Sequence, residues 1–262
     1  MREERVFERV EQKYRLTARQ RADFLQAAAG RIQLDQYGHH TIHNIYYDTD
    51  TYALIRQSIE GPKYKEKFRV RCYNQLTGDS TVFLEIKKKY RGIVYKRRTA
   101  LSRPQAGDFL RRGQLPPCPD QVLREIQYFF SFYRPRPALY LAYDREAFTG
   151  EDGLRITIDE RIRSRRSHIS LEDSPQDELL DPSHFIMEIK VPGAYPLWLS
   201  QLLSAMQLYP ISFSKYGSVY RRALSRGQLT LPRGEHPAPT AGCTPTLASR
   251  GLFGPAALGA KG

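Results

Sequence analysis

The sequence predicts an α+β fold in which helices cover one side of an antiparallel sheet. Strand-like stretches outnumber helical ones and often follow one another directly, which disfavours the regular alternation of a parallel sheet. The strands also have one charged face and one apolar face. We expect a folded unit over residues 1–225 and a disordered tail over 226–262, because the Pro, Gly, Ala, Ser and Thr of that segment offer too little apolar surface to offset the entropy of ordering.

Period-two alternation indicates the strands, and apolar contacts at helical spacing indicate the helices. Four helices are predicted: one over about 17–29 after a Thr17 cap, a short one after Ser102, one after an Asp120 cap, and one over about 196–208. The expected strands, in chain order, are 6–15, 41–47, 66–74, 81–89, 92–100, 138–147, 153–160 and 184–191.

The charge balance predicts an anionic partner. Lys and Arg outnumber Asp and Glu by 41 to 28, which gives a net charge of +13. Nucleic acid, an acidic membrane surface and polyphosphates all fit that charge. No apolar run approaches the roughly 18 residues that a membrane-spanning helix needs, and the start of the chain is charged where a signal peptide is apolar. The scattered Cys72, Cys118 and Cys243 indicate neither a disulfide framework nor a zinc site, so we expect a reduced, cytoplasmic, soluble protein.

A Glu-x-Lys pair recurs on three predicted strands, in "VEQKY" at 10–14, "FLEIKKKY" at 83–90 and "IMEIKV" at 186–191. A charged face in water would explain one such strand. For the whole set, the helices must pack on the apolar faces, so the charged faces turn toward a shared interior that a closed sheet would enclose. Like charges 4 Å apart cost roughly 4 kcal/mol at an effective dielectric of about 20, and a bound polyanion would relieve that repulsion. Glutamate among these cations suits Mg²⁺ or Mn²⁺ that bridges phosphate oxygens.

An ordered series of motifs covers most of residues 5–222. It consists of "ERVEQKY", "HNIYYDTDTY", "KFRVRCY", "FLEIKKK", "YDREAF", "LRITID", "MEIKVPG" and "SKYGSVYR". The series resembles the VTC domain, the polyphosphate polymerase module of the triphosphate tunnel metalloenzyme (CYTH-like) superfamily. No SPX-type region precedes the first motif, so the chain resembles the stand-alone bacterial type. The resemblance implies a closed, eight-stranded antiparallel barrel with helices outside it. It also implies transfer of the γ-phosphate of ATP to a growing inorganic polyphosphate chain, dependent on Mn²⁺ or Mg²⁺.

The resemblance also assigns roles to residues, motif by motif. The catalytic phosphate contacts would be Lys13, Arg69, Arg71, Lys87, Arg145 and Lys190. The substrate-binding residues would be Tyr143, Lys96, Arg155, Ser214 and Lys215. Glu188 would be the principal metal ligand, whereas Glu11 and Glu85 would be either further ligands or structural partners of neighbouring cations.

Several alternatives stay open. Tyr46, Tyr47 and Asp48 would either shape a turn after a strand or contact substrate, and Asp159 would either bind metal or pair with Arg155. The chain could also be a hydrolase of the same superfamily that cleaves tripolyphosphate or nucleoside triphosphates, or a non-catalytic polyanion- or RNA-binding module. The aromatic residues fall mainly in apolar stripes rather than between the cations, so no specific nucleic acid is expected. The expected partners are ATP and inorganic polyphosphate, together with a membrane protein that exports the product and would hold the chain at the inner membrane.

Overall fold

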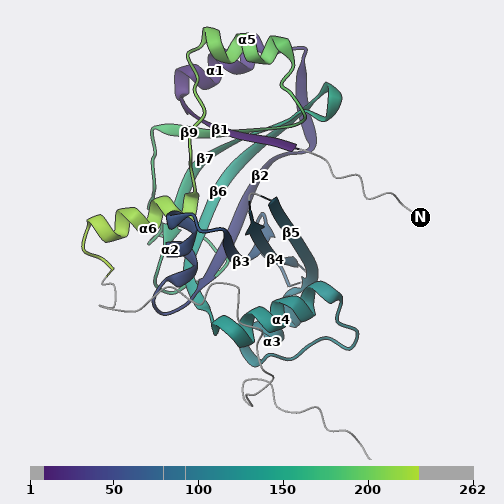
Figure 1. Ribbon diagram of the computed structural model, residues 1–262, viewed down its shortest axis with the longest axis vertical. Coiled ribbons are helices and arrows are strands. Elements are labelled where there is room, and N and C mark those ends of the chain that lie inside the picture. The colour runs from purple at the N-terminus through teal and green to yellow at the C-terminus, as the bar shows by residue number, and fades with distance from the viewer. Residues whose placement is uncertain (1–8, 79, 92, 230–262) are drawn as a thin grey trace, which may run out of the picture.

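The computed structural model describes residues 9–78, 80–91 and 93–229 (Figure 1). The strands are β1 (Arg9–Thr17), β2 (Ile32–Asp48), β3 (Tyr64–Tyr73), β4 (Thr81–Tyr90), β5 (Ile93–Ser102), β6 (Arg136–Gly150), β7 (Arg155–Arg165), β8 (Glu178–Leu179) and β9 (His184–Pro192). The helices are α1 (Ala18–Ala27), α2 (Ala53–Glu60), α3 (Arg103–Arg112), α4 (Gln121–Tyr133), α5 (Leu197–Ala205) and α6 (Lys215–Ser225), with a short 3₁₀ turn η1 (Glu151–Gly153). Most of the predicted tail, residues 230–262, lies outside the described residues.

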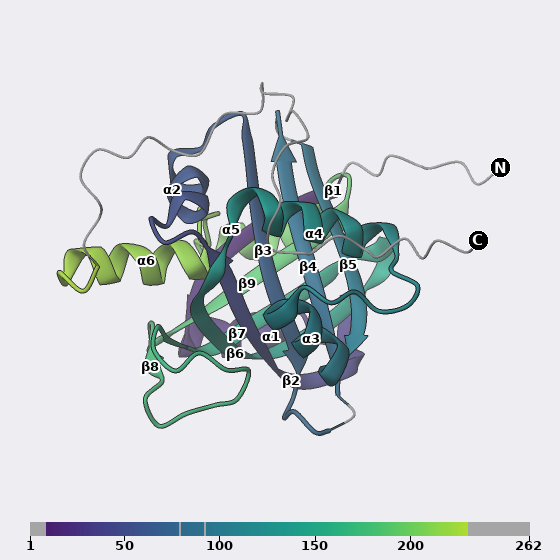
Figure 2. The ribbon, with the colours of Figure 1, turned by 90° about the horizontal axis from the view of Figure 1, so that it is seen from below.

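The strands form one antiparallel sheet in the order β1-β9-β7-β6-β2-β3-β4-β5, with the short β8 beside β7. The α+β prediction is therefore confirmed. Seen from below, β3, β4 and β5 cross in front of β6, β7 and β9, so the sheet curls back over itself (Figure 2).

The prediction of a closed barrel is not confirmed, because β1 and β5 are the two ends of the sheet and share no pairing within the described ranges. The alternation of residue types indicates which face of each strand is covered. It carries no information on whether the first and last strands exchange hydrogen bonds.

Local signals explain where several helices begin. Thr17 and Ser102 cap the starts of α1 and α3. Each cap is a capping box, because the side chain of Gln20 or Gln105 accepts from the backbone N–H of the cap residue. At the start of α4, the Asp120 side chain accepts from the backbone N–H of Leu123. These caps confirm three predicted helix starts. The predictions missed α2, α6 and β8, and β2 begins nine residues before the expected start at 41.

Three hydrophobic clusters fix the helices on the sheet. The helices α1 and α5 pack through Phe24 and Leu199 at one end of the molecule, and α3 and α4 pack through Phe109 and Ile126 at the other (Figure 1). The third cluster joins α2 and α6 to β2, β6, β7 and β9, and partly buried Leu229 packs against it. None of the described helices is both long enough and apolar enough to cross a membrane.

Candidate functional site

A cavity of about 300 Å³ collects charged side chains from most strands of the curved sheet. Both edge strands contribute, β1 through Glu11 and Lys13 and β5 through Lys96. The other lining residues are Tyr46, Lys67, Arg69, Arg71, Glu85, Lys87, Tyr143, Arg145, Glu188, Lys190, Phe213, Ser214, Lys215 and Tyr216. The cavity thus brings together every candidate site residue except Arg155, which instead pairs with Asp35 at 3.1 Å. The roles assigned to these residues stay predictions.

Strand register places three lysines in one row across β3, β4 and β5. Lys67 is opposite Lys87, and Lys87 is opposite Lys96. Burial lowers the pKa of Lys67 to about 8, with a further contribution from Lys87. Burial likewise lowers the pKa of Lys96 to about 8, and the positive charges of Arg69 and Arg71 contribute to this lowering. The row therefore carries positive charge that the fold relieves only in part, and an anion would stabilise it.

The Glu85 carboxylate neutralises part of this positive charge. Its carboxylate accepts from Arg69 Nε at 2.7 Å and lies 3.8 Å from Arg71 Nη1 and 3.6 Å from Lys96 Nζ. Burial alone would raise the pKa of Glu85, but Arg69, then Arg71 and Lys96, hold it at about 2. The side chain is 2% exposed, so Glu85 acts as a structural partner that orients the two arginines.

Asp159 holds two other cations of the cavity in place. Its buried carboxylate accepts from Arg145 Nε at 2.6 Å and Nη2 at 2.8 Å, and it also pairs with Lys215 at the start of α6. Burial by itself would raise the pKa of Asp159, but Lys215 and Arg145 hold it well below its usual range. Asp159 is thus a positioning residue; of the two roles that the sequence left open, pairing with Arg155 is wrong, because Arg155 pairs with Asp35 instead.

The three residues of the "YYD" segment have different roles: Tyr46 lines the cavity, whereas Tyr47 and Asp48 stabilise the fold. Tyr46 lines the cavity and accepts from Arg69 Nη1 at 3.2 Å, whereas Tyr47 is buried in the core. Asp48 Oδ1 accepts from the backbone N–H of Leu54 at 2.9 Å, and Oδ2 from Tyr216 Oη at 2.9 Å. Burial raises the pKa of Asp48 to about 6, although these hydrogen bonds oppose the shift. Asp48 is structural: it caps α2 and ties that helix to α6.

Glu188 and Glu11 are two further carboxylates of the cavity that were predicted as metal ligands. Register brings them together, because Lys13 is opposite Glu188 and Glu11 is opposite Lys190. The Lys190 ammonium group pairs with both carboxylates, contacting Glu188 closely and lying 3.8 Å from Glu11. It thus marks a point between them where a cation is stabilised. Burial would raise the pKa of Glu188, but Lys190 and Lys13 hold it at about 2, so the carboxylate is ionised and suited to a hard cation.

The donor set fits Mg²⁺ or Mn²⁺ only if phosphate oxygens complete the coordination. Within the described part of the chain, no group of three or more His, Cys, Asp or Glu side chains has the arrangement of a metal site. Magnesium is commonly held by one or two carboxylates together with substrate phosphates. Glu188 and Glu11 would hold the ion in this way.

Sequence reasoning missed Lys67, Phe213 and Tyr216 among the lining residues and did not identify Asp159 as the partner of Arg145 and Lys215. Lys67 was detectable, since it alternates with Arg69 and Arg71 on one face of β3. Asp159 was not, because its partners come from β6 and α6 and only the folded chain brings the three together.

The comparisons with solved structures concern the fold. A protein from Hippeastrum that carries the name adenylyl cyclase, and is described as having a dominant triphosphatase activity, is 14% identical with a TM-score of 0.51, over 87% of this chain and 100% of that one. A protein from Bacillus halodurans that carries the name adenylate cyclase is 14% identical with a TM-score of 0.49, over 78% of this chain and 92% of that one. A search of curated proteins found no significant match.

The model of one protein family, described as the VTC domain, matches residues 8–223. The match begins at β1 and ends within α6, and so includes every strand and every residue that lines the cavity. Because it extends over well more than half of the sequence, the chain belongs to the VTC domain family.

Proposed function

We propose that this protein is a polyphosphate polymerase, which transfers the γ-phosphate of ATP to the end of a growing inorganic polyphosphate chain. The observation that carries the proposal is the cationic cavity with Glu188 and Glu11 at one side. The second support is that lysines also continue along β3 and β4, beyond the row that lines the cavity. Beyond Lys67 and Lys87, the next pair on the same face is Lys65 opposite Lys89, about 7 Å farther along the strands. This extension favours a ligand longer than a triphosphate.

In the proposed reaction, a terminal oxygen of the acceptor chain forms a bond to the γ-phosphorus of ATP. The bond from that phosphorus to the β–γ bridging oxygen breaks, and ADP leaves with the electron pair. The acceptor oxygen is already anionic near neutral pH, so no general base is required. The protein's task is to position two anions against each other, which Arg69, Arg71 and Arg145 would do by paired hydrogen bonds to phosphate oxygens.

Each of these guanidinium groups is oriented before the ligand binds. Glu85 orients Arg69, and Asp159 fixes Arg145. Arg71 donates to Asn44 at 3.0 Å and to Tyr143 at 3.3 Å. Such preorganisation lowers the reorganisation cost of stabilising charge in the transition state. Glu188 and Glu11 would hold a Mg²⁺ or Mn²⁺ ion, which would supply charge neutralisation to the phosphate groups.

Triphosphate hydrolysis is the alternative activity. Water would replace the acceptor chain in the same cavity, and the Hippeastrum protein of similar fold is described as a triphosphatase. We place the reaction in the cytoplasm because ATP is the proposed donor, and we propose that a membrane protein takes up the product for export.

The decisive experiment is incubation of the purified protein with ATP and either Mn²⁺ or Mg²⁺, with products resolved by chain length and by ³¹P NMR. Long-chain polyphosphate together with ADP supports the polymerase, and orthophosphate as the sole phosphate product supports the hydrolase. Polyphosphate binding without turnover of ATP would leave a non-catalytic binder. Lys13→Ala and Lys87→Ala are expected to lower kcat/KM by on the order of 100-fold. The matched control is Arg19→Ala, which removes an exposed cation on α1 far from the cavity, and full activity in all three variants would refute the site.

A further inference from the structure

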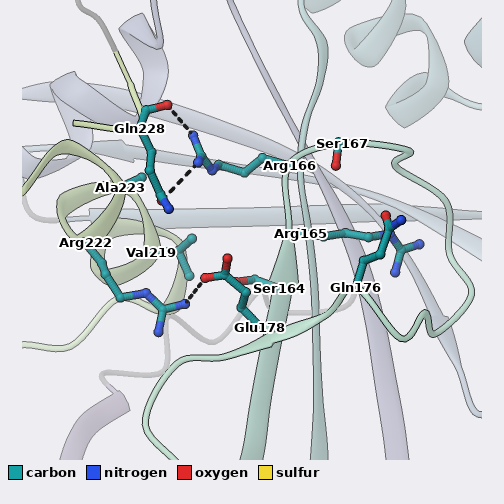
Figure 3. A pocket seen from close by; sticks show the side chains of 10 residues that line it. All are labelled: Ser164, Arg165, Arg166, Ser167, Gln176, Glu178, Val219, Arg222, Ala223 and Gln228. Atoms are coloured by element: carbon teal, nitrogen blue, oxygen red, sulfur yellow. Dashed lines mark hydrogen bonds and ion pairs between the residues drawn. The ribbon is translucent and has the colours of Figure 1, made fainter. Parts of the chain in front are cut away.

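A second pocket, of about 350 Å³, lies toward the C-terminal end of α6 (Figure 3). Its walls are α6, the end of β7 and the segment that leads into β8. Its described lining residues include three arginines and one carboxylate, Glu178, and the remaining side chains are hydroxyls, amides and small apolar groups. The pocket is separate from the catalytic cavity, with which it shares no lining residue. Its volume falls within the range of small-molecule sites.

Arg165 builds the floor of the pocket and is not available to a ligand. Its guanidinium donates to Asp177 at 2.6 Å and to the carbonyl oxygens of His168, Ser170 and Glu172. It also packs 4.0 Å from the centre of the Tyr140 ring. These contacts fix the chain between β7 and β8 and so give the pocket a built wall.

The other two arginines carry charge that is poorly neutralised. Arg166 donates to the backbone and side-chain oxygens of Gln228, both at 3.1 Å and both uncharged. Arg222 donates to the carbonyl oxygens of Leu179 and Leu180. Among the described residues its one acidic contact is Glu178 at 3.5 Å, which also pairs with Arg226 at 3.6 Å. Figure 3 shows the Arg166–Gln228 and Arg222–Glu178 pairs at the pocket wall.

The local electrostatics favour an added anion. Burial lowers the pKa of Arg222, and Arg226 lowers it further against the opposing effect of Glu178. One carboxylate is thus shared between two arginines, with Arg166 on the same pocket wall. Guanidinium groups form paired, directional hydrogen bonds with phosphate oxygens, which makes phosphate the anion that this wall fits best.

We propose that this pocket is a second ligand site, which binds the phosphate chain of a short polyphosphate or of a nucleotide through Arg166 and Arg222. Val219 and Ala223 give it a small apolar wall on α6. The pocket would be an effector site, separate from the cavity where the chemistry takes place.

Two rigid elements connect this site to the catalytic cavity. The helix α6 carries Lys215 at the cavity and Arg222 at the pocket, about 10 Å apart along the helix axis. The strand β7 carries Asp159, which holds Lys215, and five residues later Ser164, which lines the pocket. A ligand that draws Arg222 inward would therefore act on the helix that presents Lys215. The expected readout is a change in the KM for ATP, and this part of the inference rests on the proposed function.

The binding test is isothermal titration calorimetry with tripolyphosphate on the full chain. Wild-type protein is expected to bind two equivalents, and the Arg166→Gln/Arg222→Gln variant only one. The control is Arg19→Gln/Arg112→Gln, which removes two exposed arginines and the same charge without touching either pocket. Two equivalents in the pocket variant, or one in the control, would overturn the proposal.

A second variant is needed because Arg222 also anchors β8. Ser167→Leu narrows the pocket at an exposed lining residue without a change of charge, and it is expected to remove the same equivalent while thermal unfolding stays normal. Titrations with ATP and with tripolyphosphate identify the source of the phosphate chain. Equal binding of sulfate at the same ionic strength would instead mean general attraction of anions and would refute a specific site.

The result is independent of the activity assay. In Lys13→Ala, which weakens the catalytic cavity, the second equivalent is expected to persist with at most about a twofold change in Kd. A protein that makes no polyphosphate can still show the site. A protein that makes polyphosphate but binds a single equivalent has the proposed function without this inference.

Discussion

At the scale of single residues, the cavity is a set of cations whose charge the chain only partly neutralises. Glu85 and Asp159 are ionised and buried beneath arginines, whereas Lys96 shares Glu85 with Arg69 and Arg71, and no ion pair to a carboxylate is found for Lys67 among the described residues. The sequence predicts the alternation that turns Arg69 and its neighbours to one face. It cannot predict the pairing of Asp159, because the three groups involved are distant along the chain.

The lysine row makes anion binding dependent on pH. The pKa of Lys67 and of Lys96 is about 8 in the free protein, and a bound polyanion favours the charged form and raises both. Well below pH 8 the lysines are already charged, and binding exchanges almost no proton with them. Between pH 8 and the ordinary lysine pKa of about 10.4, binding is expected to take up protons, and affinity to fall as the pH rises.

Calorimetry of tripolyphosphate binding at pH 9, in buffers of different ionisation enthalpy, measures the proton uptake. Lys67→Arg/Lys96→Arg keeps both charges at that pH and is expected to lower the uptake, whereas Lys63→Arg, outside the cavity, is the matched control. An uptake that is identical in wild type and in the double variant would show that these lysines do not titrate on binding.

At the scale of elements, the sequence does not predict the helices α2 and α6, and the physical reason differs between the two. The helix α2 begins after Tyr52 in a left-handed conformation and takes its cap from Asp48, six residues before Leu54, so no local capping signal marks its start. In α6, Tyr216, Val219 and Tyr220 do recur at helical spacing. This helical periodicity is short, and it overlaps the "SKYGSVYR" motif, whose Ser214 and Lys215 the resemblance assigns to phosphate binding.

Asp48 is predicted to stabilise both helices at once. Asp48→Ala removes the acceptor for the N–H groups at the start of α2 and for Tyr216, so the free energy of unfolding is expected to fall by about 3 kcal/mol. Asp48→Asn keeps one acceptor oxygen and is expected to lose about half as much. Urea denaturation followed by circular dichroism measures the change.

The control for this change is Asp50→Ala, which removes an exposed carboxylate two residues away that pairs with Arg136 at 3.5 Å. A surface pair of this kind contributes less than about 1 kcal/mol. If Asp48→Ala and Asp50→Ala unfold at the same urea concentration, Asp48 does not hold the two helices.

At the scale of the whole molecule, the sheet surrounds the cavity without closing. The sequence predicts the antiparallel α+β class and the inward charged faces, because both follow from residue alternation and from the order of elements. Closure depends on a contact between the first and last strands of the sheet, and no pattern along either strand encodes it.

Hydrogen exchange tests the open edge. Amides of β5 that do not bond to β4 are expected to exchange at least about tenfold faster than those of β6, which lies between β2 and β7. Mass spectrometry of the peptides that cover residues 93–102 and 136–150 gives the comparison. Equal, slow exchange in both strands would mean that β5 is paired on both sides and that the barrel is closed.

The unpaired strands also determine how a long polymer can be taken up. A linear chain enters a closed ring only by one of its ends, and it leaves only after its whole length has passed through the ring. Here the edge strands β1 and β5 both line the cavity but do not pair with each other across the described residues, so the sheet does not form a closed ring. Under the proposed function, an unclosed sheet means that a polyphosphate chain would not need a free end to enter or leave the cavity.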